Sequence, residues 1–467
     1  MQNTPASPPE FLKDVRLTRA LPPSTIVRFL RPFQQFLSNE ASGGLLLLFC
    51  SVVALVWANS PWSHSYHLLW HTQLQIGLGA RAVNQDLHFW VDDLLMVVFF
   101  FVVGLEIKRE MLVGELASPR KAALPILAAS GGVIVPALIY ALLNHGTPDS
   151  HGWGIPMATD IAFALGVLVL LGDRIPPNLK VFLAALAIVD DIAAVIVIAI
   201  FYTPHIEWIG LCLAASCTML LVLSNRLGIR HPLPYALLGI ALWSAVWHSG
   251  IHPTIAGVVL AFTIPARTTL NATQFVERGR IVLNHFEGAA RNSASVLTDS
   301  EQQFAIEALE DSCERVQAPL HRFEKALHPW VTFAIMPIFA LANAGVTLTG
   351  NLASAYAHRV TLGVLLGLLL GKPVGITLVS WLSVRGGWAA LPPGVSWRHI
   401  HGTAWLAGIG FTMSLFVAGL SFAEAQSLVF AKLGVLTGSL CAGLLGSALL
   451  RQTARRQRRL QRKPAPA

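Results

Sequence analysis

The chain has very few charged residues for its length. Asp, Glu, Lys and Arg make up 12% of its 467 residues, hydrophobic residues make up 54%, and the mean hydropathy is +0.59. Soluble globular proteins carry roughly a quarter charged residues. This scarcity excludes an ordinary soluble domain and predicts many membrane spans. The formal net charge of +8 therefore has to be interpreted from where the charges lie.

Cysteine is scarce too, and other familiar signals are missing. The five cysteines contain no Cys-x-x-Cys pair, so we expect neither a disulfide framework nor a zinc site. The first 41 residues hold no apolar stretch that ends in a small-residue cleavage site, so we expect no cleaved signal peptide. A Gly-rich phosphate-binding loop is absent, so the sequence does not support ATP-driven pumping.

Apolar segments long enough to cross a membrane recur along the chain. A helix needs about 20 residues to span the hydrocarbon core. Twelve segments approach or exceed this length and predict an all-α membrane protein with twelve transmembrane helices. Several of them are short or are interrupted by Gly and Pro. They lie at residues 42–58, 89–107, 122–143, 153–172, 179–202, 208–224, 234–248, 252–266, 329–348, 360–382, 402–422 and 429–450.

The distribution of Lys and Arg predicts the orientation of these spans. Basic residues accumulate in the cytoplasmic loops of membrane proteins. One set of alternate connections contains all but four of the 33 Lys and Arg residues. The opposite connections contain only Arg81 and Arg359, and the span interiors contain only Lys372 and Lys432. We therefore expect both termini to lie in the cytoplasm.

This topology divides the chain into three parts. A cytoplasmic tail at 1–41 precedes the twelve-span domain at 42–450, and a basic cytoplasmic tail follows at 451–467. Because the basic tail directly follows the last span, attraction to anionic lipid explains it better than binding to nucleic acid.

Two connections between the predicted spans are long. The external one contains a predicted hairpin over about residues 73–88, with Gly77 and Gly79 near its tip. The cytoplasmic one covers about residues 267–328. Within it, Thr298 and Glu301 have the spacing of a capping box before a charged amphipathic helix. We expect this helix to be a surface element near the membrane.

Two adjacent carboxylates lie at the centre of one span. Asp190 and Asp191 have at least eight apolar or small residues on either side. An ionisable residue at this depth is costly and indicates a functional site. Bonds to neighbouring helices could explain the pair, but Ser or Asn would serve packing at lower cost.

A second span carries a carboxylate beside a helix break. Thr159 and Asp160 follow Gly152, Gly154 and Pro156, which are expected to interrupt the helix. Unwound backbone at this depth is tolerated only where it lines a cavity or is buried in protein. A proline kink capped by Thr and Asp is the alternative interpretation.

The second half of the chain supplies a buried cation and another weak helix. Lys372 lies midway through the span 360–382 and needs an anionic partner, so a purely structural ion pair remains an alternative. The span 402–422 is rich in glycine and hydroxyl groups, which tight helix packing could also explain. One interrupted span in each half, the fourth and the eleventh, predicts inverted repeats with crossing interrupted helices around a mid-membrane site. The relevant residues are Gly408, Gly410, Thr412 and Ser414.

These groups suit the exchange of a hard cation for a proton. Sodium and lithium prefer oxygen ligands, which two aspartates, the Thr159 hydroxyl and free backbone carbonyls can supply. Burial favours the protonated carboxylate, so one group can hold either a proton or a metal ion. Adjacent residues on a helix point about 100° apart. We therefore assign Asp191 to the ion and Asp190 to pairing with Lys372.

Seven motifs resemble the bacterial sodium/proton antiporter family of the NhaA type, in the family's order from about residue 40 to 450. They are Gly-Leu-Glu-Ile-Lys-Arg-Glu (104–110), Ala-Thr-Asp-Ile-Ala-Phe-Ala-Leu-Gly (158–166), Ala-Ile-Val-Asp-Asp (187–191), Leu-His-Pro-Trp (327–330), Asn-Ala-Gly-Val (343–346), Gly-Lys-Pro-Val-Gly (371–375) and Gly-Ile-Gly-Phe-Thr-Met-Ser (408–414).

The resemblance implies an electrogenic Na⁺(Li⁺)/H⁺ antiporter of the bacterial inner membrane, activated at alkaline pH, for sodium and pH homeostasis. It implies a homodimer joined partly through the external hairpin, with no resident cofactor. It assigns ion binding to the residues that match Asp190, Asp191, Thr159 and Asp160, and a further functional aspartate to Asp93.

The resemblance also implies a cytoplasmic pH-response cluster at Glu106, Arg109 and Glu324, and assigns a further role in the pH response to His252. A solvated helix end could explain the first two residues, and an interfacial imidazole could explain His252. His321 stands where the family often has Lys, which is a departure from the family's pattern in the pH-response cluster.

Three other functions are compatible with a polytopic chain. A sodium-coupled symporter of an organic anion would need an anion-binding group, but Lys372 can pair with the aspartates instead. An intramembrane aspartyl protease needs two facing carboxylates on separate helices, whereas Asp190 and Asp191 are adjacent on one helix. A passive channel would need a polar lining, and the spans are too uniformly apolar for one.

Overall fold

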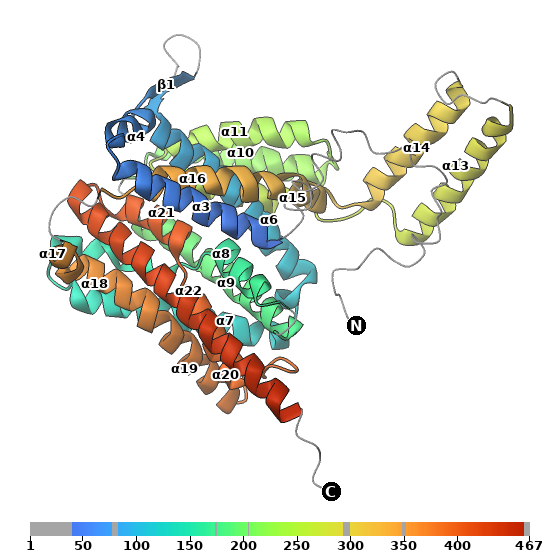
Figure 1. Cartoon of the computed structure of the whole chain (residues 1–467). Helices are drawn as coiled ribbons and strands as arrows, with labels where there is room; N and C mark the ends of the chain where they lie inside the picture. The colour runs from blue at the N-terminus through green and yellow to red at the C-terminus, as the bar shows by residue number, and fades with distance from the viewer. Residues whose placement is uncertain are drawn as a thin grey trace, which may run out of the picture.

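The protein is a bundle of helices, which we describe from a computed structural model (Figure 1). The described residues are 40–76, 83–172, 175–203, 205–292, 299–347 and 352–461. The α helices are α3 (Glu40–Ala58), α4 (Ser63–Trp70), α5 (Leu87–Phe89), α6 (Met96–Val113), α7 (Pro119–Leu143), α8 (Ile161–Leu170), α9 (Pro177–Phe201), α10 (Trp208–Arg226), α11 (Pro232–His248), α12 (Thr254–Thr263), α13 (Ala272–Asn292), α14 (Ser300–Val316), α15 (Pro319–Trp330), α16 (Met336–Asn343), α17 (Leu352–Ala357), α18 (Arg359–Leu366), α19 (Lys372–Arg385), α20 (Trp397–Leu406), α21 (Phe411–Ser421) and α22 (Ala425–Gln461).

Shorter helical elements and one hairpin connect these helices. Tighter 3₁₀ segments are η3 (Glu115–Ala117) and η4 (Pro148–Met157), and wider π-helical segments are η2 (Trp90–Leu95), η6 (Val331–Ile335) and η7 (Gly367–Gly371). The two strands are β1 (Gln73–Ile76) and β2 (Val83–Asp86).

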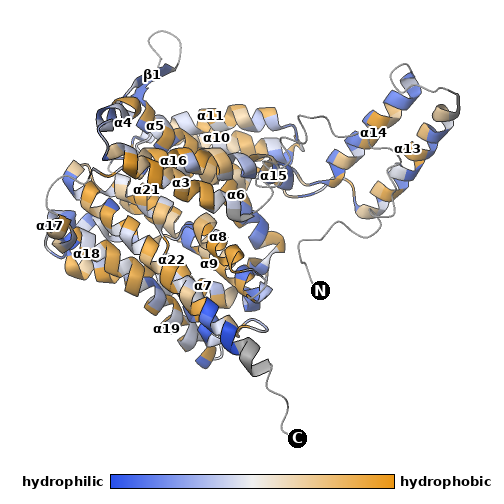
Figure 2. Ribbon diagram, viewed as in Figure 1, coloured by the Kyte–Doolittle hydropathy of each residue, from blue (hydrophilic) through white to orange (hydrophobic). Residues whose placement is uncertain are grey.

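All twelve predicted apolar segments coincide with helices of the structure. Among the described residues, seven helices are long and apolar enough to cross a membrane, or nine if each of two bent pairs counts as one span. The other three segments correspond to η2 with α6, to α11 and to the short apolar helix α12. Hydrophobic residues predominate along the helices of the bundle (Figure 2). The chain is therefore an all-α membrane protein, and the twelve-span topology stays a prediction.

The predicted hairpin is present at one end of the bundle, which we call the hairpin end. Strands β1 and β2 pair antiparallel, with Gln73 opposite Asp86 and Ile76 opposite Val83. Its tip, including Gly77 and Gly79, lies outside the described residues. At its base, Asp86 caps α5 by accepting a 2.9 Å hydrogen bond from the Phe89 amide. This cap joins the hairpin to η2 and α6.

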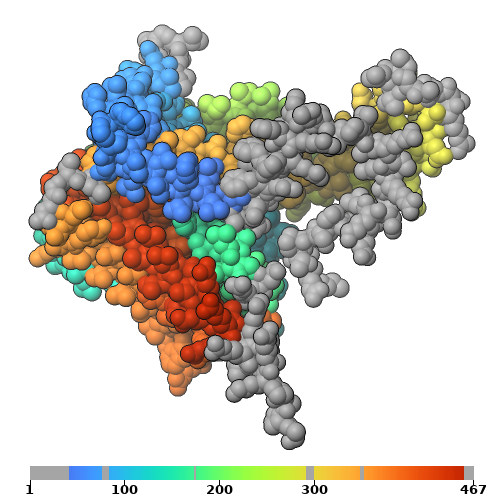
Figure 3. All heavy atoms as spheres, in the orientation of Figure 1, coloured from blue at the N-terminus to red at the C-terminus, as the bar shows by residue number. Residues whose placement is uncertain are grey.

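Both glycine-rich spans are interrupted near their middle. The first consists of η4, an extended stretch at 158–160 and α8. The second consists of α20 and α21, which are bent by 47° at residues 407–410. The Asp160 amide donates a 2.7 Å hydrogen bond to the Ile409 carbonyl, so the two breaks lie side by side. Part of α8 reaches the surface between α3 and α22 (Figure 3).

A close helix contact positions the span that carries Lys372. Gly131 of α7 and Gly375 of α19 face each other so closely that an added Cβ atom on Gly375 would lie 2.1 Å from the Gly131 carbonyl oxygen. Only glycine allows this approach. The π-helical segment η7 directly precedes Lys372, and such segments often occur at functional sites.

The long connection at about residues 267–328 contains a helical hairpin of α13 and α14 that projects from the bundle (Figure 1). Its capping differs from our prediction. Thr298 lies outside the described residues, and Asp299 caps α14 by accepting from the amides of Glu301 and Gln302. Helix α22 continues beyond the predicted end of the last membrane span at residue 450, to Gln461.

Candidate functional site

The two adjacent aspartates lie in the middle of α9, one of the most apolar helices. Asp190 is 1% exposed and Asp191 is 2% exposed. The flanking residues are alanines and larger apolar residues with no Gly or Pro among them, so α9 continues through the pair without a break. The helix packs against α7, α8 and α6, which bring other polar groups to the same depth.

Lys372 pairs with Asp190. Its Nζ atom donates to Oδ2 of Asp190 and, at 2.8 Å, to the Thr159 hydroxyl. The Thr159 hydroxyl has two acceptors within hydrogen-bond distance. They are the same Asp190 oxygen at 2.6 Å and the Ala407 carbonyl oxygen at 2.9 Å. Lys372 and Thr159 are both fully buried. The network thus joins α9, α19 and the two helix breaks in a space closed to water.

Asp191 lies beside this network without joining it. Among the described residues, no donor forms a hydrogen bond with its side chain, and its Oδ1 atom is buried without a partner. Buried polar groups are normally paired, so each exception needs an explanation. Its carboxylate interacts electrostatically with Asp190, Asp160, Glu106 and Lys372. A buried carboxylate oxygen without a hydrogen-bond donor, such as that of Asp191, can bind either a cation or a proton.

Asp160 is bonded as a helix cap. Its Oδ1 atom accepts from the Phe163 amide at 3.0 Å, which caps the first turn of α8. Its Oδ2 atom accepts from the amide of Thr412 at 3.1 Å and from the Thr412 hydroxyl at 2.6 Å. The capping role that the alternative interpretation gave to Asp160 is therefore present, whereas the Thr159 hydroxyl bonds Asp190 and Ala407 instead of capping the helix. The Asp160 carboxylate also ties α8 to the start of α21.

Glycines at the second break allow this close approach. An added Cβ atom on Gly408 would lie 2.6 Å from the Leu368 carbonyl oxygen, and one on Gly410 would lie 2.9 Å from the Ala158 carbonyl oxygen. Each glycine therefore brings the α20–α21 break against neighbouring backbone beside Thr159 and Asp160.

The expected pH-response residues are divided between the two ends of α6. Arg109 forms a 2.8 Å ion pair with Glu324 of α15, and Glu106 interacts electrostatically with both. His321 lies 3.9 Å from Glu324. His252 is elsewhere, at the start of α12.

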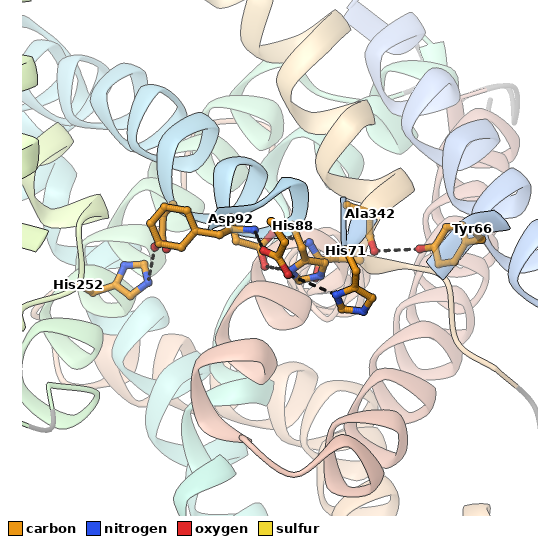
Figure 4. Close-up of polar contacts among 10 residues, drawn as sticks. Tyr66, His71, His88, Asp92, His252 and Ala342 are labelled. Carbon is orange, nitrogen blue, oxygen red and sulfur yellow. Dashed lines mark hydrogen bonds and ion pairs between the residues drawn. The ribbon is translucent and has the colours of Figure 1, made fainter. Parts of the chain in front are cut away.

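At the hairpin end, two consecutive carboxylates of η2 point to different helices. Oδ1 of Asp93 lies 3.3 Å from Nε2 of His252. Oδ1 of Asp92 accepts a 2.7 Å hydrogen bond from the Asn343 side chain of α16, and its Oδ2 lies 3.1 Å from Nδ1 of His88. Figure 4 shows these contacts across the ends of the helices. Helix geometry places Asp93 about 20 Å from Glu106 along α6.

Sequence reasoning assigned no role to four residues of this region: Asp92, His88, Asn343 and Lys432. A signal was available for two of them. Asp92 is a second acidic residue near a predicted span end, and Lys432 is a cation inside a predicted span. Their partners come from distant parts of the chain, which the sequence does not place.

A preformed cluster for a resident metal is not seen in the part of the chain that the structure describes. There, no group of three or more His, Cys, Asp or Glu side chains is arranged to hold a metal ion. The central oxygens come instead from two carboxylates, a threonine and carbonyls at the breaks, a donor set that suits a weakly held, exchangeable cation.

Comparison with known proteins relates most of the chain to one family. Residues 34–450 match the model of the family described as Na⁺/H⁺ antiporter 1. A protein of Koribacter versatilis named Na(+)/H(+) antiporter NhaA is 51% identical over 437 residues, which cover 94% of each chain. A protein of the same name from Oleidesulfovibrio alaskensis is 50% identical over 429 residues, covering 92% of this chain and 95% of the relative.

Proposed function

The chain belongs to the Na⁺/H⁺ antiporter 1 family, and we propose that it expels sodium or lithium from the cell in electrogenic exchange for protons. It is by family a sodium/proton antiporter and a transporter rather than an enzyme. Its transported ions are Na⁺ and H⁺. Lithium as cargo, the electrogenic stoichiometry, regulation by pH and the roles of individual residues are the parts that we propose.

The observation that carries the proposal is the pair of unequal aspartates. Both aspartates have a buried Oδ1 atom without a partner, but Oδ2 of Asp190 is bonded to Lys372 and Thr159, whereas the Asp191 side chain makes no hydrogen bond among the described residues. A buried carboxylate of this kind gains either from a proton or from a cation. We assign Asp191 as the group that alternates between the two.

Three elements supply oxygens for a cation shell at the aspartate pair. Asp190 belongs to the same helix as Asp191, Thr159 to the stretch between η4 and α8, and the Ala407 carbonyl, which accepts from Thr159, to the break after α20. Asp160 holds the two breaks together and adds negative charge that favours a cation. The alternation of cation and proton at Asp191 then couples the two ion flows.

Electrogenic exchange needs more protons to enter than sodium ions to leave. Asp190 forms an ion pair with Lys372 and adjoins Asp191, so a cation bound at one carboxylate acts on all three groups as one set. Displacement of protons from this set by one sodium ion can release more than one proton. This supports an electrogenic cycle without assigning the second proton to one residue.

Regulation by pH is proposed to act through Glu106, Arg109 and Glu324. These residues lie at the end of α6 away from the hairpin, and Glu106 interacts electrostatically with both Glu324 and Asp191. A change of charge in this cluster therefore changes the electrostatic interaction with Asp191 at the ion site. His252 contacts Asp93 at the other end of α6, so it would respond to the opposite side of the membrane.

The remaining proposals concern location and assembly. The basic residues predict a bacterial inner-membrane protein with both termini in the cytoplasm, in contact with anionic lipid. The β1–β2 hairpin would then lie outside, where its strand edges can pair with those of a second copy. We propose a homodimer joined in this way.

The direct test is sodium-induced collapse of a preformed pH gradient in vesicles that contain the purified protein. We expect sodium and lithium, but not potassium, to release protons, with the rate rising from about pH 6 to about pH 9. A membrane potential imposed with a potassium ionophore should change the rate, because the exchange is electrogenic. Sodium that releases no protons at any of these pH values would disprove the exchange.

A further inference from the structure

Lys108, near the end of α6, is bonded to the backbone of α12. Its Nζ atom donates to the carbonyl oxygens of Phe262 and Ile264 at 2.6 and 2.5 Å. Lys108 also lines a cavity of about 620 Å³ whose other charged residues, within the described ranges, are Arg226, Arg230 and Arg267. Since these neighbours are cations, backbone carbonyls and not carboxylates hold the Lys108 ammonium.

The end of α12 needs such donors. The last carbonyl groups of a helix have no amide partner within the helix, and a lysine there also interacts favourably with the helix dipole. Between the two carbonyls that Lys108 bonds, the Thr263 carbonyl accepts a 2.7 Å hydrogen bond from the Asn225 side chain of α10. Side chains of α6 and α10 therefore bond three consecutive carbonyls and fix this end of α12.

Lys108 belongs to the face of α6 that packs along α12. Residues Val97, Gly104 and Lys108 share this face by their helical spacing. An added Cβ atom on Gly104 would lie 2.7 Å from the Cβ atom of Ala261, and one on Gly257 of α12 would lie 2.3 Å from the Val97 carbonyl oxygen. The two helices are therefore in close contact along this face, and Lys108 joins them where it ends.

Glu106 lies on the opposite side of α6. It is two residues from both Gly104 and Lys108, which is a rotation of about 200° around a helix. Helix α9, which carries Asp191, also packs against α6, and Glu106 interacts electrostatically with Asp191. A rotation of α6 about its axis would therefore change the separation of Glu106 and Asp191.

Other charged groups also lie near Glu106. Helix α12 and η6, which both pack against α6, contain no ionisable side chain. On α9, Asp190 is paired with Lys372, which leaves Asp191 as the carboxylate without a bonded cation on that side. The remaining groups are Arg109 and Glu110 of α6, Glu324 of α15, which is paired with Arg109, and Glu115 of η3, which is paired with Lys121.

We propose that Lys108 is a positioning residue of the pH response: its bonds to the end of α12 fix the rotation of α6 and hold Glu106 toward Asp191. The proposal rests on the proposed antiport function and its regulation by pH. Like charges that lie close together favour the protonated form of a carboxylate. Loss of the Lys108 bonds would let Glu106 turn away, so Asp191 would exchange its proton for sodium at a lower pH.

The test measures the half-activating pH, at which sodium-induced collapse of a pH gradient in vesicles reaches half its maximal rate. We expect Lys108→Met to lower this pH by about half a unit, whereas simple loss of a cation would raise it by favouring protonated carboxylates. Lys108→Arg can still donate to both carbonyls and should keep the parent value. Lys121→Met neutralises an exposed lysine of α7 and serves as the matched control. It should also keep the parent value.

A second pair of variants changes the same contact without changing any charge. The methyl group of Gly104→Ala would push α6 away from Ala261, so the half-activating pH and the melting temperature in detergent should both fall. Addition of Ala261→Gly removes the atom that the new methyl group meets. The double variant should therefore recover part of both losses, which the Ala261→Gly variant alone makes it possible to calculate.

The outcomes can be told apart from failure of the antiport function. A parent protein without exchange would refute the proposed function, and this proposal with it. In an active parent protein, an unchanged or raised half-activating pH in Lys108→Met would overturn the proposal and leave the antiport function intact. A lower melting temperature of Gly104→Ala with an unchanged half-activating pH would also overturn it, because the α6–α12 contact would then serve packing alone.

Discussion

His252 and Asp93 are in contact, with Nε2 of the imidazole 3.3 Å from Oδ1 of the carboxylate. The contact joins the start of α12 to η2, and the His252 ring also packs against Phe416 of α21. Two residues to which the family resemblance gave separate roles therefore form one unit at the hairpin end. A change at either residue should affect the other, and both lie far from Glu106.

Replacement of Asp191 by Asn should abolish sodium-dependent proton movement. Asn keeps the size of the side chain but cannot exchange a proton for a cation. The measurement is sodium-induced collapse of a pH gradient in everted vesicles, with the amount of inserted protein measured in the same vesicles. The matched control is Asp311→Asn, which removes an exposed ion pair with Arg315 and should keep the parent rate. Full exchange by Asp191→Asn would show that Asp191 is not the ion ligand.

Lys372→Ala should destabilise the protein. The Asp190 carboxylate would be left buried without its countercharge, at a cost of about 3–5 kcal/mol in the free energy of unfolding. The melting temperature in detergent should fall, and the pH profile of exchange should shift. Addition of Asp190→Ala to this variant should recover part of the lost stability. An unchanged melting temperature and pH profile would contradict the importance of the pair.

Asp160 should tolerate Asn better than Ala. Ala removes the cap of α8, worth about 1 kcal/mol, and leaves the Thr412 donors unpaired at about a further 1–3 kcal/mol. Asn can still cap α8 through its carbonyl oxygen. We therefore expect a lower melting temperature for Asp160→Ala than for Asp160→Asn. If Asp160→Ala and Asp160→Asn have the same melting temperature but both lose exchange, Asp160 acts on the bound ion rather than through its cap of α8 and its bonds to Thr412.

Gly375→Ala should be poorly tolerated. The added methyl group would lie 2.1 Å from the Gly131 carbonyl oxygen, so α7 and α19 would have to separate and Lys372 would move. We expect a lower melting temperature and an exchange rate reduced about tenfold or more. Gly419→Ala is the matched control, because no atom lies within 4 Å of its added Cβ atom in α21. Equal behaviour of the two variants would contradict the close contact.

The ion pair of His88 with Asp92 should make stability depend on pH. Burial by itself would lower the pKa of His88, but the hydrogen bond and charge of Asp92 outweigh it, and the pKa is raised. Lys432 opposes this shift and Asp86 adds to it. A raised pKa means that the pair stabilises the fold fully below the ordinary histidine value of 6.5. The contribution is lost as the pH rises through the raised value.

The corresponding measurement compares His88→Gln with the parent protein. The difference between their melting temperatures should be larger at about pH 6 than at about pH 9. His285→Gln, an exposed histidine of α13, should show no such trend. A difference that stays constant with pH would show that the His88 charge does not contribute.

The sequence by itself determined that the chain is a membrane protein of this family and which buried ionisable groups form its candidate site. Long apolar segments with few charges are stable in the hydrocarbon core of a membrane, where a helix also satisfies its own backbone hydrogen bonds. Because a charge is costly at that depth, the rare ionisable residues of the span interiors, such as Asp190, Asp191 and Lys372, could be recognised without a structure. The β1–β2 hairpin and the positions of both helix breaks followed from glycine and proline.

Tertiary structure decided which of these groups meet. Pairing of Lys372 with Asp190 and the missing donor at Asp191 depend on how α9, α19 and the two breaks pack, and contacts between distant segments are not encoded in local periodicity. The direction of Asp92 and Asp93 likewise depends on the π-helical turn of η2, which a regular helix model does not include. Close packing of distant helices selects one partner for each buried charge, and only the folded chain shows which one it is.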